Sequence, residues 1–254
     1  MSSTAARTSN EQEFDELRLR IDLAAALRLA ARFNWHESVG NHFSVAVSPA
    51  GRRFLMNPRW RHFALLKASE LLLLDGEDAD ALQGENPPDP SAWTIHSLLH
   101  LKVKHARVVL HLHPPYATAV AALRDPTLLP IDQNTARFHG RIAQDLHYGG
   151  IADEASEGAR LAHILGDCSV LMMGNHGVLV VGETIAEAFE DLYFLERACQ
   201  TLILAYSTGQ PLQVMTAELA ARTARDWKEY WRMPFAHFEE LKRMLDQEDP
   251  SYAR

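Results

Sequence analysis

The sequence predicts an α/β fold in which a central sheet lies between two layers of helices. Short apolar runs of strand character alternate along the chain with segments whose apolar residues recur every three to four positions. The chain has 254 residues, 47% of them hydrophobic, which is enough to build a large, well-buried core. No repeat or linker divides it, so we expect a single domain over residues 1–254.

The first third of the chain is predicted to contain a helix, three strands and the start of a second helix. Apolar residues at helical spacing indicate an amphipathic helix from Phe14 to Phe33. Two strands flank a Pro-Ala-Gly turn in "HFSVAVSPAGRRFLMNP", and a third strand in "ELLLLDGED" stops at Asp75-Gly76. After the Pro-rich "GENPPDP", Ser91 is predicted to cap a helix through "AWTIHSLLHLKVKH".

The rest of the chain is predicted to continue this alternation. We expect a strand in "RVVLHLH", a helix in "YATAVAAL", loops and short strands in "DPTLLPIDQNTARFHGRIAQDLHYGG", a helix in "DEASEGARLAHILGD" closed by Gly166, two strands in "SVLMMGNHGVLVVGET", a long helix over Ile185–Ser207, and further helices to the end.

Composition excludes several classes of function. A net charge of -8 and a pI near 5.9 argue against a nucleic-acid surface. No apolar stretch approaches the roughly 20 residues that a membrane span needs, and the N-terminus lacks a secretory signal. Cys168 and Cys199 lie in apolar contexts without metal-binding spacing, as expected of buried thiols. We therefore expect a soluble, cytoplasmic protein with no membrane or nucleic-acid partner.

Two histidines near the end of an apolar strand are candidate metal ligands. His111 and His113 are two positions apart in "RVVLHLHPP", so their side chains point to the same side of the strand. Such a pair can hold a metal ion, or it can be two hydrogen-bonded histidines at a strand end. His176 lies between Gly174 and Gly177 at a tight turn. Three imidazoles with an open position form a catalytic metal site, but spacing alone does not show that they meet.

Four motifs, "VGNHFS", "PSAWTIHSLLH", "VVLHLHPPYATAV" and "MMGNHGVLVVG", occur in an order and at separations that resemble the class II aldolase/adducin family. The resemblance covers about residues 22–206, which we take as the core, with a helical C-terminal tail at 212–254. It implies a three-layer α/β/α fold with a largely antiparallel central sheet, and a homo-oligomer, tetramer or dimer, with active sites at subunit junctions.

The resemblance also implies a cofactor. His111, His113 and His176 match the histidines that hold one divalent metal ion per subunit, zinc by family, with Fe2+, Mn2+ and Co2+ as alternatives. Adducin head domains in the same family lack these histidines, and their presence here separates the chain from them.

The chain departs from the sugar-phosphate aldolases at two places. Their acid/base glutamate is replaced by Ala92 in "PSAW", and a methyl group cannot move a proton. Their phosphate-binding turn is replaced by "MNPRWRHF", which contains Arg59 and Arg61. Of the polar set, Asn41 and Ser91 remain. A guanidinium binds a carboxylate through two hydrogen bonds, so these four residues are predicted to bind a small unphosphorylated carboxylic acid, aromatic acids included. The alternative is a surface loop whose arginines pair with nearby acids.

A missing acid/base needs a replacement if the aldolase mechanism is kept. We rank His139, in the irregular segment "NTARFHGR", first for this role. His96 and His100 are four apart on one predicted helix, a spacing shared by metal clips and by packed helix histidines.

Three functions are compatible with these residues. The first is a metal-dependent lyase that cleaves a carbon–carbon bond, by decarboxylation or an aldolase-type reaction, in an oxo- or hydroxy-carboxylic acid. The second is a non-haem iron oxygenase that decarboxylates such an acid oxidatively at the same three histidines, since softness rules do not separate zinc from iron there. The third is a noncatalytic, adducin-like scaffold.

Overall fold

The computed structural model describes residues 15–78, 80–84, 87–150 and 155–254. Seven strands in these residues form one mixed sheet in the order β3-β2-β1-β4-β7-β6-β5. Neighbouring strands are antiparallel except β5 and β6, which confirms the predicted, largely antiparallel sheet. The strands are β1 (His42–Ala46), β2 (Arg53–Met56), β3 (Leu72–Asp75), β4 (Val108–Leu112), β5 (Ile142–Asp145), β6 (Val170–Met173) and β7 (Gly177–Gly182).

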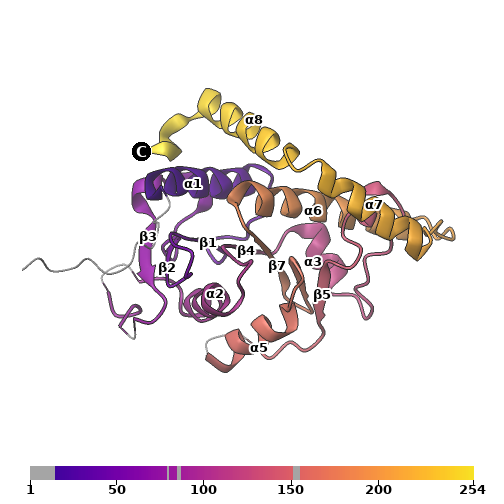
Figure 1. Cartoon of the computed structure of the whole chain (residues 1–254), viewed down its shortest axis with the longest axis horizontal. Coiled ribbons are helices and arrows are strands. Elements are labelled where there is room, and N and C mark those ends of the chain that lie inside the picture. Colours follow the sequence, from indigo (N-terminus) through magenta and orange to yellow (C-terminus); the bar gives the residue numbers. More distant parts are fainter. Residues whose placement is uncertain (1–14, 79, 85–86, 151–154) are drawn as a thin grey trace, which may run out of the picture.

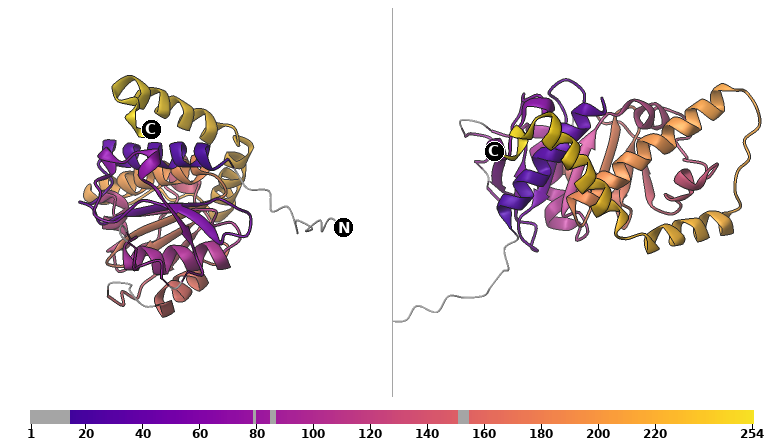
Figure 2. Two further views of the ribbon diagram at one scale, coloured as in Figure 1. Left: turned by 90° about the vertical axis from the view of Figure 1, so that its left-hand side faces the viewer. Right: turned by 90° about the horizontal axis from the view of Figure 1, so that it is seen from above.

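Helices cover both faces of the sheet (Figure 1). One face carries α1 and α6, the other carries α2 and α5, and α8 crosses the outer side of α1 and α6 (Figure 2). The helices are α1 (Glu16–Arg32), α2 (Pro90–Lys102), α3 (Pro115–Ala121), α4 (Gln133–Ala136), α5 (Ala155–Leu165), α6 (Ile185–Ser207), α7 (Ala217–Glu229) and α8 (Met233–Glu248), with 3-10 turns at Phe63–Leu65, Ala68–Glu70 and Pro250–Ala253.

Strand alternation divides the core into two layers. On β4, Val108, Leu110 and Leu112 pack in the layer with α1 and α6. Val109, between them, packs with α2 and α5. Because side chains alternate along a strand, His111 shares the face of Val109. The candidate metal ligands therefore lie on the α2 side of the sheet.

The predicted cap of the second helix was wrong. Asp89, not Ser91, is the N-cap of α2, because its side chain accepts the N–H groups of Ser91 at 2.9 Å and Ala92 at 3.4 Å. Pro90 takes the first helical position, where its missing N–H costs nothing. Ser91 lies inside the first turn instead.

Other boundaries agree with the prediction or lie outside the described residues. The long helix spans Ile185–Ser207 as predicted, with Thr184 as its N-cap. Gly166 follows α5 with φ of +52°, a conformation that suits glycine at a helix end. The predicted helix start at Phe14, and residues 85–86 and 151–154, lie outside the described part of the chain. The limits proposed for the core and the tail stay predictions.

No described helix combines the length and the apolar character that crossing a membrane requires.

Candidate metal centre

The β6–β7 turn brings the third histidine against the β4 strand end. Asn175 takes the left-handed conformation with φ of 56°, which asparagine tolerates, and His176 follows it. At Gly177, an added Cβ would lie 2.4 Å from Cδ2 of His113 and 2.8 Å from the carbonyl oxygen of Leu112. Only glycine lets the turn lie this close to His113.

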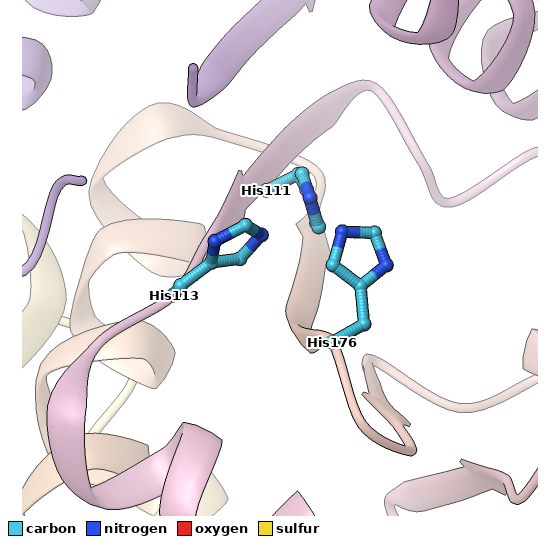
Figure 3. A group of neighbouring side chains, drawn as sticks. All are labelled: His111, His113 and His176. Atoms are coloured by element: carbon cyan, nitrogen blue, oxygen red, sulfur yellow. The ribbon is translucent and has the colours of Figure 1, made fainter. Parts of the chain in front are cut away.

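His111, His113 and His176 form one cluster. One ring nitrogen of each lies within 4.8 Å of those of the other two. The ring centroids are 5.1 Å apart for His111 and His113, 4.8 Å for His111 and His176, and 4.9 Å for His113 and His176. Figure 3 shows the three rings turned toward a common centre. The spacing fits three imidazoles around a single cation with a position left open.

Hydrogen bonds to the outer nitrogens orient two of these rings. Nδ1 of His111 donates to the carbonyl oxygen of Val178 at 3.0 Å, and Nδ1 of His113 donates to the carboxylate of Glu37 at 2.5 Å. In a neutral imidazole with its proton on Nδ1, Nε2 carries the lone pair. Nε2 of His113 is buried and has no hydrogen-bond partner among the residues that the structure describes. A metal ion would satisfy this lone pair, and the carboxylate–histidine contact is typical of metal ligands.

Burial keeps two of the three imidazoles, His111 and His176, in the form that binds metals. It holds the pKa of His111 well below its usual range, with smaller effects from the histidines around it. Burial and the nearby His113 lower the pKa of His176 to about 4. Both imidazoles are therefore neutral at neutral pH, which is the protonation state of a ligand.

Two residues at this site were missed by sequence reasoning. Glu37, in the loop between α1 and β1, carries no motif that links it to His113. His42 is the cross-strand partner of His111, and their ring centroids are 4.7 Å apart. It is present in the motif "GNHFS", and its position two residues before Ser44 on the same face was the available signal.

The position of the missing glutamate is apolar in the structure. Ala92 is 1% exposed and packs in a small cluster with Phe54 and Met56. Asp89, three residues earlier, uses its carboxylate to cap α2 and to accept the hydroxyl of Ser91 at 2.6 Å. Ala92 itself supplies no acid or base.

Arg59 and Arg61 line a cavity of about 510 Å³ together with Trp60, Glu70 and neighbouring residues. The guanidinium of Arg59 lies 4.2 Å from the centre of the Trp60 ring, and Arg61 pairs with Glu70. Trp60 is 69% exposed and takes a φ of 59°, an uncommon conformation for a bulky residue. A cation and an aromatic ring thus face one polar cavity, while Arg61 also has the acidic partner that the alternative interpretation expected.

The arginine loop, residues 57–61, begins beside β1, the strand that carries His42. The N–H of Phe43 donates to Oδ1 of Asn57 at 2.8 Å, and Nδ2 of Asn57 donates to the carbonyl of Asn41 at 3.3 Å. Asn41 is itself buried, and within residues 15–78, 80–84, 87–150 and 155–254 its Nδ2 has no hydrogen-bond partner. An unsatisfied donor of this kind is costly unless a ligand or water accepts from it.

His139 does not join the three histidines within one chain. It follows α4 and lies three residues before β5, whereas His176 lies three residues after β6. Because β5 and β6 are parallel, with Ile142 opposite Val170, the two histidines flank opposite ends of the strand pair. A strand of this length spans about 10 Å.

Comparisons with known proteins agree with this fold. The sequence profile described as Class II Aldolase and Adducin N-terminal domain matches residues 21–203. An aldolase II superfamily protein from Pseudomonas syringae is 33% identical, with a TM-score of 0.85 and 98% of each chain covered. L-fuculose 1-phosphate aldolase from Glaciozyma antarctica shares the fold at 24% identity, with a TM-score of 0.80 over 99% of this chain and 97% of that one. Beta-adducin from Homo sapiens is 26% identical over 90% of this chain but only 33% of its own length.

Proposed function

The chain belongs to the class II aldolase and adducin family, and on that premise we propose that it is a divalent-metal-dependent lyase for a small, unphosphorylated oxo- or hydroxy-carboxylic acid. The observation that carries the proposal is the three-histidine cluster, with a buried Nε2 on His113 that no group in the described part of the chain satisfies. A scaffold has no need of such an arrangement. Buried polar atoms without a partner are rare, and a bound ion is one of the features that explain them.

The cation would be held by His111, His113 and His176, and when bound it supplies Lewis-acid stabilisation of a negatively charged oxygen. Family membership favours zinc as the bound metal, and Fe2+, Mn2+ and Co2+ are alternatives that imidazole ligands also bind. Glu37 orients His113 through its hydrogen bond. Asn41, immediately before β1, offers a buried N–H donor.

The substrate class follows from the arginine loop. Glu70 lines the same cavity and pairs with Arg61, so Arg59 is the cation best placed to bind a carboxylate, and Trp60 supplies an aromatic surface. We assign Arg59, Arg61, Asn41 and Ser91 to substrate binding. Replacement of Arg59 with leucine is expected to raise KM for the acid more than it lowers kcat.

The alanine at position 92 restricts the reaction. Loss of carbon dioxide breaks a carbon–carbon bond without removing a proton from carbon, so it needs no base at that position. Decarboxylation therefore fits the site more directly than an unaltered aldol cleavage. His139 remains the proposed proton carrier only if a neighbouring subunit brings it to the cluster, because its own chain holds it at the other end of β5.

Ala92 also favours a second candidate function. An iron oxygenase that decarboxylates a 2-oxo or 2-hydroxy acid oxidatively needs no carboxylate at position 92. Likeness to beta-adducin supports the noncatalytic alternative, but the complete histidine set argues against it.

Turnover with and without oxygen separates these functions. Protein purified without added metal or chelator would be incubated with aromatic and aliphatic 2-oxo and 2-hydroxy acids, beside His113→Ala. Histidine-dependent release of carbon dioxide or an aldehyde under anaerobic conditions supports the lyase. Turnover that requires oxygen and consumes it supports the oxygenase. No turnover in any arm, with equal metal content in both proteins, supports the scaffold.

We also propose that the chain forms a homo-oligomer, dimer or tetramer. Tyr230 and Trp231, between α7 and α8, are 62% and 61% exposed, and apolar side chains of this size are enriched at protein interfaces. Light scattering coupled to size-exclusion chromatography tests this, and a monomer at micromolar concentration would contradict it.

A further inference from the structure

A row of buried hydrogen bonds leads from His42 into the protein beneath α2. Nδ1 of His42 lies 2.7 Å from Nε2 of His96, and Nδ1 of His96 lies 2.5 Å from Oγ of Ser44. The same Oγ lies 2.6 Å from Nε2 of His100, whose Nδ1 lies 2.8 Å from the carbonyl oxygen of Ala106. His42, Ser44, His96 and His100 are all at most 5% exposed. We call these four residues the histidine relay.

The last bond fixes the direction of every other bond in the relay. A carbonyl oxygen only accepts, so Nδ1 of a neutral His100 must carry the proton and its Nε2 must accept from the Ser44 hydroxyl. Ser44 has a single proton to give and therefore accepts from Nδ1 of His96. Burial keeps these rings neutral, lowering the pKa of His96 well below its usual range and that of His100 to about 4.

The same logic reaches His42. Nε2 of His96 has no proton left and accepts from Nδ1 of His42, so Nε2 of His42 carries a lone pair. The His42 ring lies against His111, a member of the metal cluster, with ring centroids 4.7 Å apart. His42 is not among the three histidines whose nitrogens converge. The His42 ring thus lies beside the metal cluster without belonging to it.

We propose that the histidine relay makes His42 a substrate-positioning residue, whose Nε2 accepts a hydrogen bond from a hydroxyl group of the acid bound at the three histidines. The inference rests on the proposed function and narrows its substrate to an acid that carries a hydroxyl group, beside the oxo group that takes up the electron pair when carbon dioxide leaves. A hydroxyl can donate to a fixed acceptor and a carbonyl oxygen cannot. A site that hydrogen-bonds the substrate hydroxyl in this way binds an analogue without that hydroxyl more weakly.

The tautomer is measured first, on the full chain without metal. Two-bond proton–nitrogen correlation spectra of 15N-labelled protein at neutral pH should show His42 protonated at Nδ1 and bare at Nε2. Ser44→Ala removes the donor to His100 and the acceptor of His96, and should leave His42 as a mixture of both tautomers. A wild-type His42 protonated at Nε2 would overturn the inference without any assay of activity.

Ligand selectivity is measured second, by calorimetry on metal-loaded protein with lactate and pyruvate as probes. These acids differ in the hydroxyl or oxo group next to the carboxylate. We expect wild type to prefer lactate, and His42→Phe to lose that preference by about tenfold, as expected for one hydrogen bond. His42→Gln, whose amide oxygen can replace the acceptor, should keep part of it.

The outcomes distinguish this inference from the proposed function. An unchanged lactate-to-pyruvate ratio in His42→Phe, at equal metal content and equal helical circular dichroism, overturns the inference alone. Metal-loaded wild type that does not prefer lactate to pyruvate would also overturn the inference alone. Wild type that holds no metal through its three histidines overturns the proposed function, and the substrate role of His42 with it.

Discussion

His113 and Glu37 are joined by a hydrogen bond of 2.5 Å, although 76 positions separate them in the chain. The carboxylate fixes the orientation of the His113 ring, with Nε2 facing the other two histidines. Its negative charge makes Nε2 a stronger electron-pair donor to a metal ion. Glu37→Gln should therefore weaken zinc binding by about 10- to 100-fold, as for other partners of metal-binding histidines. Competition with a zinc-chelating dye measures this. Glu240→Gln, which alters an exposed carboxylate paired with Arg243 on α8, is the matched control and should bind zinc as wild type does.

Gly177→Ala should disturb the cluster through packing alone. The new methyl group would meet the His113 ring at 2.4 Å and the Leu112 carbonyl at 2.8 Å, so the turn that carries His176 has to move. We expect a loss of about 1–3 kcal/mol in the free energy of unfolding, together with weaker metal binding. Gly84→Ala meets no atom of the described residues within 4 Å, and it should change neither the stability nor the metal binding. Equal behaviour of the two variants in urea unfolding and metal titration would refute the close approach.

Much of the fold could be predicted from the sequence, because its signals are local. The helix Ile185–Ser207 has a threonine cap before it and Gly209 after it, and both ends lie where they were predicted. The α2 start was misassigned because Ser91 and Asp89 are both good caps. Pro90 between them was the deciding sign, since proline suits the first helical position and so favours the residue before it.

The site depends on contacts that local patterns do not contain. Spacing placed His111 and His113 on one face, but their meeting with His176 depends on the β4–β7 pairing. His42 reaches His111 only through the antiparallel register of β1 and β4. The irregular segment around His139 favours it as a proton carrier. The parallel pairing of β5 with β6, however, puts His139 at the opposite end of this strand pair from His176.

Trp60 is expected to carry backbone strain. Its φ of 59° costs about 1–2 kcal/mol for a residue with a Cβ atom and little for glycine. Trp60→Gly and Trp60→Ala both remove the ring, so the difference between them isolates the backbone. The glycine variant should be more stable by about 1 kcal/mol in urea unfolding. An alanine variant of equal or greater stability would contradict the left-handed conformation.

Stability should fall as the pH drops below the ordinary histidine range. Burial lowers the pKa of His100 from 6.5 to about 4 in the folded protein, so between these values the unfolded chain binds a proton that the folded chain does not. The contribution of His100 is complete above about pH 6.5 and decreases as the pH falls towards 4. His100→Gln should thus lose less stability than wild type between about pH 7 and pH 5.

Urea unfolding at the two pH values gives this comparison. His163→Gln, at an exposed position on α5, is the control and should keep the wild-type pH dependence. A His100→Gln protein with an unchanged pH dependence would show that His100 is not buried and neutral in the folded state.

The central claim is that His111, His113 and His176 hold one metal ion. Elemental analysis of protein purified without added metal or chelator, beside His113→Ala and His163→Ala, tests it most directly. We predict a near-stoichiometric divalent metal in wild type and in His163→Ala, and its loss in His113→Ala, since His113 provides one of three ligands. Metal content that is equal in wild type and His113→Ala, or absent from both, would contradict the claim.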